Sequence, residues 1–121
     1  MSVRAFVPMI YVASVPRSIA FYRILGFVET NAHTPEGAIE PVWAWLRSGD
    51  AQLMLARGTA PVDPEKPAGL FYAYCDDVDA FRMMVVEAGI DAGAIARPFY
   101  APRGEFRIVD PDGHVVMISH T

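Results

Sequence analysis

The feature that most constrains the fold is a predicted β-hairpin near the end of the chain, Gly104 to Ser119, GEFRIVDPDGHVVMIS. Pro111 fixes φ for a turn, and Gly113 can adopt the left-handed conformation that closes a three-residue loop. This register predicts that Asp110 faces His114, Arg107 faces Met117 and Glu105 faces Ser119. Glu105, Arg107, Met117 and Ser119 then share one face of the hairpin, and Phe106, Ile108, Val116 and Ile118 share the other.

A weaker copy of this hairpin lies sixty-three residues upstream, where Trp43–Ala56, WAWLRSGDAQLMLA, superposes on Phe106–Ser119. The same offset superposes Phe6–Val15 on Gly69–Val78 and Gly26 on Gly89. Independent segments have no reason to share turns, helix ends and apolar alternation at one fixed offset. The chain is therefore predicted to contain a repeated unit.

The first unit is predicted to run strand, helix, strand, strand, strand. Its elements are an alternating strand Val3–Val12, a helix capped by Ser14 and ended by Gly26, a short strand Phe27–Asn31, a polar loop His33–Pro41 and the first hairpin. Because Pro8 has no amide proton to donate, the first strand is expected to lie at a sheet edge or to carry a bulge.

The second unit is predicted to follow the same order. Its elements are a strand Leu70–Cys75, a helix capped by Asp77 with a buried stripe of Phe81, Met84, Val85 and Ala88 ended by Gly89, a short strand Ala94–Phe99 and the second hairpin. The proline-rich segment 58–68 is expected to link two modules, residues 1–57 and 69–121.

Composition narrows the class of protein. With 53% hydrophobic and 20% charged residues, the 121-residue chain is expected to form a single globular domain. The formal charge of −4 and the absence of a Lys/Arg run argue against a nucleic-acid partner. The chain has no apolar window long enough for a membrane span and no secretory signal, so a cytoplasmic protein is expected. The single cysteine, Cys75, is expected to pack inertly in its strand.

The repeated unit resembles the vicinal oxygen chelate superfamily, which includes glyoxalase I, extradiol dioxygenases, fosfomycin resistance enzymes and bleomycin resistance proteins. The resemblance rests on S-V-P-R-S-I-A-F-Y-x-x-L-G-F, Ser14 to Phe27, and on E-F-x-x-x-D-P-D-G, Glu105 to Gly113. It implies an α+β fold in which two βαβββ modules curl a mixed sheet into a half-barrel with the helices outside.

The same resemblance implies where metal ligands would lie, on the first and last strands of each module. Carried over by position, they fall on Val7 and Met54 in the first module and on Leu70 and Met117 in the second. Valine and leucine have no donor atom, and a methionine thioether suits only soft ions. We therefore expect no metal and no other cofactor, which places the chain closest to the metal-free bleomycin-resistance-like branch.

Strand alternation predicts which residues face the groove of such a half-barrel and which face the helices. The groove face comprises Val7, Met9, Tyr11, Gln52, Met54, Leu70, Tyr72, Tyr74, Val115 and Met117. The helix-facing set is Ile10, Val12, Leu53, Leu55, Phe71, Ala73, Val116 and Ile118. Tyrosine and methionine on the groove face suit a small-molecule pocket, and packing or a dimer contact is the alternative.

Four further side chains leave alternatives open. Glu105 and Arg107 either orient a polar ligand or pair with each other at the rim. Trp43 and Trp45 point to the groove if Gly49 and Asp50 form a two-residue turn, and to the helix if the turn has three residues. His33, His114 and His120 have no metal-ligand spacing.

The function predicted from these features is binding of a small drug-like or cationic amphipathic molecule by a homodimer, independently of metal. Its expected ligand contacts are Met9, Tyr11, Gln52, Met54, Tyr72, Tyr74, Glu105, Arg107 and Met117. The alternative is an enzyme of the same superfamily, of lyase, isomerase or dioxygenase type, with acid/base chemistry carried by Glu105 with Tyr72 or Tyr74. A standard metalloenzyme is disfavoured.

Overall fold

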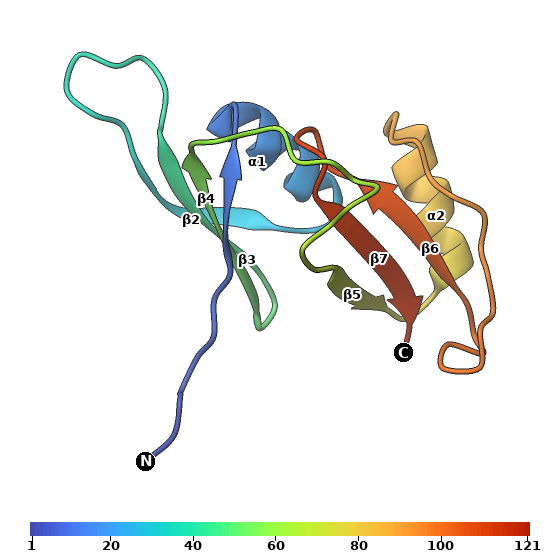
Figure 1. Cartoon of the computed structure of the whole chain (residues 1–121). Coiled ribbons are helices and arrows are strands. Elements are labelled where there is room, and N and C mark those ends of the chain that lie inside the picture. The colour runs from blue at the N-terminus through green and yellow to red at the C-terminus, as the bar shows by residue number, and fades with distance from the viewer. The chain divides into compact units, whose positions relative to one another are not determined.

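The computed structural model describes residues 1–121 and contains two compact units, Met1–Pro61 and Val62–Thr121 (Figure 1). Each unit places one helix on one open, mixed β-sheet, so the fold is α+β as predicted. Neither helix is long and apolar enough to cross a membrane.

The first unit has four strands in the order β1-β4-β3-β2. They are β1 (Met9–Val12), β2 (Val28–His33), β3 (Trp43–Ser48) and β4 (Ala51–Arg57), with β1 parallel to β4 and the other pairs antiparallel. Helix α1 (Val15–Ile24) follows β1 and begins as predicted, because the Ser14 hydroxyl accepts a hydrogen bond from the Arg17 amide at 3.2 Å.

Two strands of this unit differ from their predicted bounds. Strand β1 begins only at Met9, because Pro8 cannot donate to the sheet, and residues 1–8 form no strand. As Pro8 predicted, β1 lies at an edge. Strand β2 continues to His33 and has a bulge at Thr30, whose hydroxyl donates to the Trp45 carbonyl at 3.1 Å.

The second unit has three strands in the order β5-β7-β6, with β5 parallel to β7 and β6 antiparallel to it. They are β5 (Phe71–Cys75), β6 (Glu105–Val109) and β7 (Val115–His120), and helix α2 (Val78–Glu87) begins at the predicted cap Asp77. The predicted strand Ala94–Phe99 does not form. Only Ala96 makes a bridge, to Glu105, because Pro98 has no amide proton and the surrounding alanines bury little apolar surface.

The buried stripe of α2 was only partly predicted. Met84 is 41% exposed and Ala88 is also exposed, whereas Val78 and Val85 are fully buried. These two valines are seven residues apart and therefore lie on the same side of the helix, which centres the buried arc on them. Beneath this helix, Phe106, Ile108 and Ile118 are at most 1% exposed and form the core of the unit.

The two hairpins differ in the length of their turns. The β3–β4 hairpin pairs Ser48 with Ala51 and so has a two-residue turn, whereas the β6–β7 hairpin has the predicted three-residue turn Pro111–Gly113. In the latter the Asp110 carboxylate accepts hydrogen bonds from the amides of Asp112 and His114, each at 2.9 Å. The predicted pairs Arg107–Met117 and Glu105–Ser119 are confirmed.

Part of the predicted linker contacts the second unit. The Val62 amide donates to the Asp112 carbonyl at 2.7 Å, and a Cβ at Gly113 would collide with the Val62 carbonyl oxygen. Gly113 has φ +98, so glycine is required here both for the backbone conformation and for this close approach.

Candidate functional site

The outer surface of the first sheet carries two tryptophans, and the two-residue turn decides their orientation. Trp45 pairs with Met54, and Met54 pairs with Met9, so these side chains share a face. Trp43 lies on the same face, which is the orientation that the two-residue alternative predicted. We call this surface the tryptophan face, made of Met9, Tyr11, Trp43, Trp45, Gln52 and Met54.

Hydrogen bonds connect the polar groups of the tryptophan face. The Gln52 Oε1 atom accepts from the Trp45 Nε1 atom and from an Arg47 Nη2 atom, each at 3.0 Å. The rings of Trp43 and Trp45 meet edge to face with centroids 6.3 Å apart. The amide oxygen of Gln52 is therefore already used by its neighbours.

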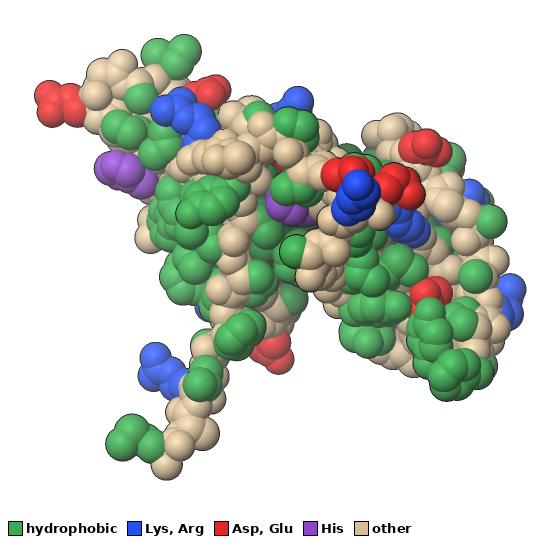
Figure 2. All heavy atoms as spheres, viewed as in Figure 1, with side chains coloured by type: hydrophobic (Ala, Val, Ile, Leu, Met, Phe, Trp, Pro, Cys, Tyr) green, Lys and Arg blue, Asp and Glu red, His purple; other side chains and the backbone are tan.

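The corresponding surface of the second sheet carries the tyrosines. Tyr72 pairs with Met117 and Met117 with Arg107, while Tyr74 pairs with Ser119 and Ser119 with Glu105. These pairs put Tyr72, Tyr74, Glu105, Arg107 and Met117 on one side of the sheet, and we call this surface, together with Tyr100, the tyrosine face. The predicted alternation is confirmed for Met9, Tyr11, Tyr72 and Tyr74, which are exposed (Figure 2 shows hydrophobic side chains at the surface of each unit). Val115, predicted for the same face as Met117, is only 1% exposed, and Val7 and Leu70 lie before β1 and β5, outside the strands.

Tyr72 and Tyr74 form the aromatic part of the tyrosine face. Their rings stack with centroids 6.2 Å apart and an interplanar angle of 28°. The side chains remain 40% and 66% exposed. Partial burial raises the pKa of the Tyr72 phenol above its ordinary value, and the negative charge of Glu105 and the neighbouring Tyr100 raise it further.

Glu105 is the unusual group of this face. It is only 5% exposed, its Oε1 atom has no hydrogen-bond partner, and its Oε2 atom lies 3.5 Å from the Tyr100 hydroxyl. The alternative in which Glu105 pairs with Arg107 is wrong, because an Arg107 Nη2 atom donates instead to the Pro64 carbonyl at 2.7 Å. The two charged groups lie on the same face, as predicted, but act separately.

Tyr100 was missed as a site residue. It lies in the loop before β6, next to Phe99, and the two rings meet edge to face at 5.3 Å. An exposed aromatic pair in the proline-rich loop RPFYAPRG was the available signal, since a connection has no structural need for two large rings. Its contact with Glu105 depends on the bridge between Ala96 and β6, which the sequence did not show.

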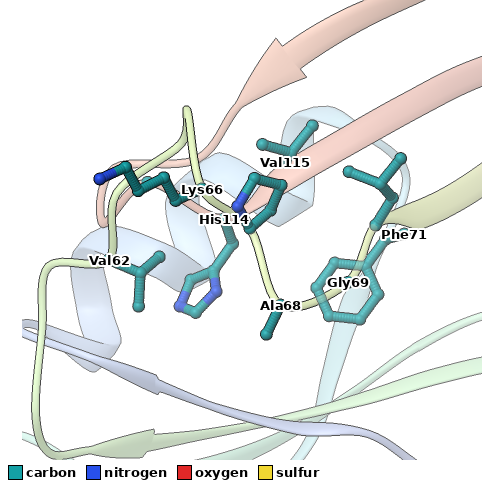
Figure 3. A pocket seen from close by; sticks show the side chains of 10 residues that line it. Val62, Lys66, Ala68, Gly69, Phe71, His114 and Val115 are labelled. Atoms are coloured by element: carbon teal, nitrogen blue, oxygen red, sulfur yellow. The ribbon is translucent and has the colours of Figure 1, made fainter.

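A cavity of about 370 Å³ lies in the second unit between the segment 62–71 and the start of β7 (Figure 3). Its lining includes Val62, Lys66 and Phe71 from that segment, and His114 and Val115 from the end of the turn and the start of β7. Leu70, one of the implied metal positions, also lines this cavity. The wall is mostly apolar and offers no cluster of metal donors.

The implied metal positions do not fit a metal ion. Met54 and Met117 lie on β4 and β7, while Val7 and Leu70 lie just before β1 and β5, and none of the four has an oxygen or nitrogen donor in its side chain. Nowhere in residues 1–121 do three His, Cys, Asp or Glu side chains come close enough to hold a metal.

The lone cysteine belongs to β5, outside these surfaces. Cys75 is half-buried and unpaired with any other cysteine. Burial raises the pKa of its thiol, a hydrogen bond to the Asp77 backbone partly offsets this, and the charges of Asp76 and Asp77 raise it further. A raised pKa lowers the fraction of nucleophilic thiolate. The inert packing of Cys75 stays a prediction.

Each unit of this chain places one helix on an open mixed sheet and carries one aromatic face. These features define a class of α+β proteins built from two similar units. The chain belongs to the Glyoxalase/Bleomycin resistance protein/Dioxygenase superfamily, whose family profile matches residues 5–118. The resemblance drawn from the sequence is thereby confirmed. No curated protein matches the chain.

Solved structures with the same fold cover nearly the whole chain. A bleomycin-binding protein complexed with bleomycin has 20% identity and a TM-score of 0.73, over 98% of this chain and 99% of that chain. TnmS3, an antibiotic binding protein from Streptomyces sp. CB03234, has 20% identity and a TM-score of 0.76, over 99% and 98%. The fosfomycin resistance protein FosX from Listeria monocytogenes has 10% identity and a TM-score of 0.80, over 100% and 95%. At these identities the likeness establishes the fold alone.

Proposed function

We propose that this chain is a metal-independent binding protein for a small, drug-like molecule of cationic and amphipathic character. The observation that carries the proposal is the tyrosine face, where the stacked rings of Tyr72 and Tyr74 on β5 are 40% and 66% exposed. Such rings offer a flat apolar surface with hydroxyl groups at its margin, which suits a planar ligand. The net charge of −4 attracts a cation at long range.

Two comparisons support the proposal without testing it. The superfamily includes bleomycin resistance proteins, and two structures of the same fold are described as binding bleomycin or an antibiotic. Metal independence is supported by the side chains at the implied ligand positions, Val7, Met54, Leu70 and Met117, which lack oxygen and nitrogen donors.

The test is a thermal-shift screen of planar and cationic drug-like molecules, with elemental analysis of the purified protein beside it. A ligand at 100 times its dissociation constant should stabilise the fold by about 2.7 kcal/mol. A panel in which no molecule raises the unfolding temperature would overturn the binding function. One tightly held divalent ion per chain would overturn metal independence only.

We also propose that the protein is a cytoplasmic homodimer. Met9 and Tyr11 on the first sheet are 45% and 52% exposed, and the tyrosine face adds a second exposed apolar surface. Exposed apolar patches of this kind commonly mark interfaces, and most soluble homo-oligomers are twofold dimers. Light scattering at micromolar concentration checks this, and a monodisperse monomer contradicts it.

An enzyme remains the second candidate, favoured by one observation. Glu105 has a buried carboxylate oxygen, Oε1, without a hydrogen-bond partner, and the phenol of Tyr100 lies beside the same carboxylate. This arrangement also suits a general base. Mass spectrometry of any ligand found in the screen, after prolonged incubation with the protein, separates the candidates. Recovery of unchanged ligand supports binding, and conversion to a product supports catalysis.

A further inference from the structure

We propose that Glu105 and the rings of Tyr72, Tyr74 and Tyr100 form a subsite for a protonated amine of the bound molecule. The inference rests on the proposed binding function and deepens it, because it names the chemical group that one part of the tyrosine face recognises. It depends on one unusual group, a carboxylate that is buried and left without a partner.

The carboxylate of Glu105 lacks the partners that a buried charge needs. The side chain is 5% exposed, and Oε1 has no hydrogen-bond donor within reach. The only hydrogen bond to Oε2 comes from the Tyr100 hydroxyl at 3.5 Å, which is at the outer limit of a hydrogen bond. Buried charges in proteins are normally paired, so an unpaired one indicates a missing partner that carries positive charge and N–H groups.

The chain itself does not supply that partner. Arg107, the cation nearest along the same face, directs an Nη2 atom to the Pro64 carbonyl at 2.7 Å. Arg103 donates to the Thr121 carbonyl, and Arg82 donates to the carbonyls of Ala92 and Gly93. Arg97, next to the bridging residue Ala96, is exposed and makes no hydrogen bond to Glu105, whose Oε1 atom is left without a partner. None of these arginines therefore pairs with the carboxylate, which remains available to a ligand.

The aromatic rings around Glu105 favour a cation over a neutral donor. Tyr72 and Tyr74 stack on β5, which β7 separates from β6, and Glu105 is close enough to Tyr72 to raise the pKa of its phenol. Tyr100 reaches the carboxylate from the loop. The faces of aromatic rings carry partial negative charge and attract an ammonium group. The Tyr72 phenol is neutral near pH 7, as any ordinary tyrosine is, and the charge that acts on it is that of Glu105.

A ligand can reach this group from the side of the loop. Tyr100 is 60% exposed and its neighbour Phe99 is 95% exposed, so a rotation of the Tyr100 side chain meets little resistance. The same rotation would free Oε2, the carboxylate oxygen that the Tyr100 hydroxyl contacts, for an incoming ammonium while the ring remains beside it. A primary or secondary amine fits best, because it brings N–H donors as well as charge.

The experiment compares two probes of nearly equal shape, 2-phenylethylammonium and 2-phenylethanol, titrated into the full chain at constant ionic strength and followed by amide chemical shifts. We expect the wild type to bind the ammonium at least about tenfold more tightly, since a hydrogen bond to a buried charge is worth this much. Glu105→Gln, which keeps the shape and removes the charge, should reduce that preference to about twofold or less.

Two further variants control the experiment. Glu87→Gln removes the same charge from an exposed position at the end of α2 and should keep the preference. Tyr100→Ala, on an exposed loop, should weaken ammonium binding by about two- to fivefold and leave the alcohol almost unaffected.

If the wild type binds both probes with equal affinity, the amine subsite is overturned. It is also overturned if Glu105→Gln keeps the preference for the ammonium over the alcohol. Absence of ammonium binding up to about 20 mM also overturns it, because a paired buried charge should give at least millimolar affinity. The failure of the subsite is distinct from failure of the proposed function. If the screen yields ligands while the two probes bind equally, small-molecule binding stands and only the amine subsite falls.

Discussion

The two sheets carry different chemistry at equivalent positions. Met54 and Met117 correspond through the repeat, and the residue paired with Met54 is Trp45, whereas the residue paired with Met117 is Arg107. The tryptophan face connects its polar groups through Gln52, while the tyrosine face contains a buried carboxylate oxygen without a partner. One scaffold thus supports a surface whose side-chain polar groups bond to one another and a surface on which one buried oxygen is left without a hydrogen-bond partner. The two faces differ more in whether their polar atoms have hydrogen-bond partners than in how many apolar side chains they carry.

The largest expected effect separates the core of the second unit from its tyrosine face. Phe106→Ala removes a ring that is 1% exposed and should lower the free energy of unfolding by about 3 to 5 kcal/mol. Tyr72→Ala removes a ring that is 40% exposed and should cost about 1 kcal/mol or less, because no sealed cavity is left. Denaturant melts of both variants measure this difference.

The same Tyr72→Ala variant also tests ligand binding. Its affinity for a molecule found in the screen should be lost or strongly reduced, while binding survives in Phe106→Leu, a conservative core control. A Tyr72→Ala variant that unfolds as easily as Phe106→Ala would mean that the tyrosine face is packed interior.

The two hairpin turns should respond differently to the same substitution. Gly49→Ala places a side chain at φ +57 in open space and should cost about 1 kcal/mol. Gly113→Ala adds a collision with the Val62 carbonyl to a similar backbone penalty and should cost about 3 kcal/mol. Thermal unfolding compares the variants, and equal losses would show that segment 62–64 is not held against the turn.

A third comparison predicts opposite signs on the two faces. Gln52→Met leaves the indole N–H of Trp45 and the Arg47 guanidinium without their shared acceptor and should cost about 1 kcal/mol. Glu105→Gln removes an unpaired buried charge, so without ligand it should leave stability unchanged or raise it by about 1 kcal/mol. A clear loss of stability in Glu105→Gln would mean that the carboxylate has a structural partner.

The smallest expected effect is the alkaline titration of Tyr72. Because the folded protein raises the pKa of this phenol, its contribution to stability is present below the ordinary value near 10 and is lost as the pH rises through the folded value. Wild-type stability should therefore fall more steeply than that of Tyr72→Phe above about pH 10. Tyrosinate absorbance at 295 nm in both proteins follows the ionisation, and identical titrations would contradict the shift.

Local chemistry made much of the fold predictable. Ser14 and Asp77 cap their helices, and the Asp110 side chain closes the three-residue turn, because each of these groups bonds to backbone amides a few residues away. Once that turn is fixed, strand alternation gives the register of β6 and β7. The faces of both sheets follow from the same alternation.

The rest depends on contacts between distant residues. Gly49 and Asp50 are compatible with turns of two or three residues, so the sequence could not orient Trp43 and Trp45. The predicted strand Ala94–Phe99 is reduced to the bridge from Ala96 to Glu105, and the contact of Tyr100 with Glu105 joins a loop to a strand, which strand alternation does not predict. The sequence also predicts that the tryptophan and tyrosine faces line one groove, and this stays a prediction.

The difference of one residue between the two turns also bears on how such a chain can acquire a new surface. Because side chains alternate between faces at every residue, one residue gained or lost in a turn exchanges the inner and outer sides of a neighbouring strand. When the two repeats are superposed by sequence, Trp45 aligns with Ile108. In the sheets, however, Trp45 pairs with Met54 as Arg107 pairs with Met117, so Trp45 takes the structural position of Arg107. After a gene duplication, a single codon inserted into or deleted from a turn is enough to turn new side chains outward while the strands themselves are inherited unaltered.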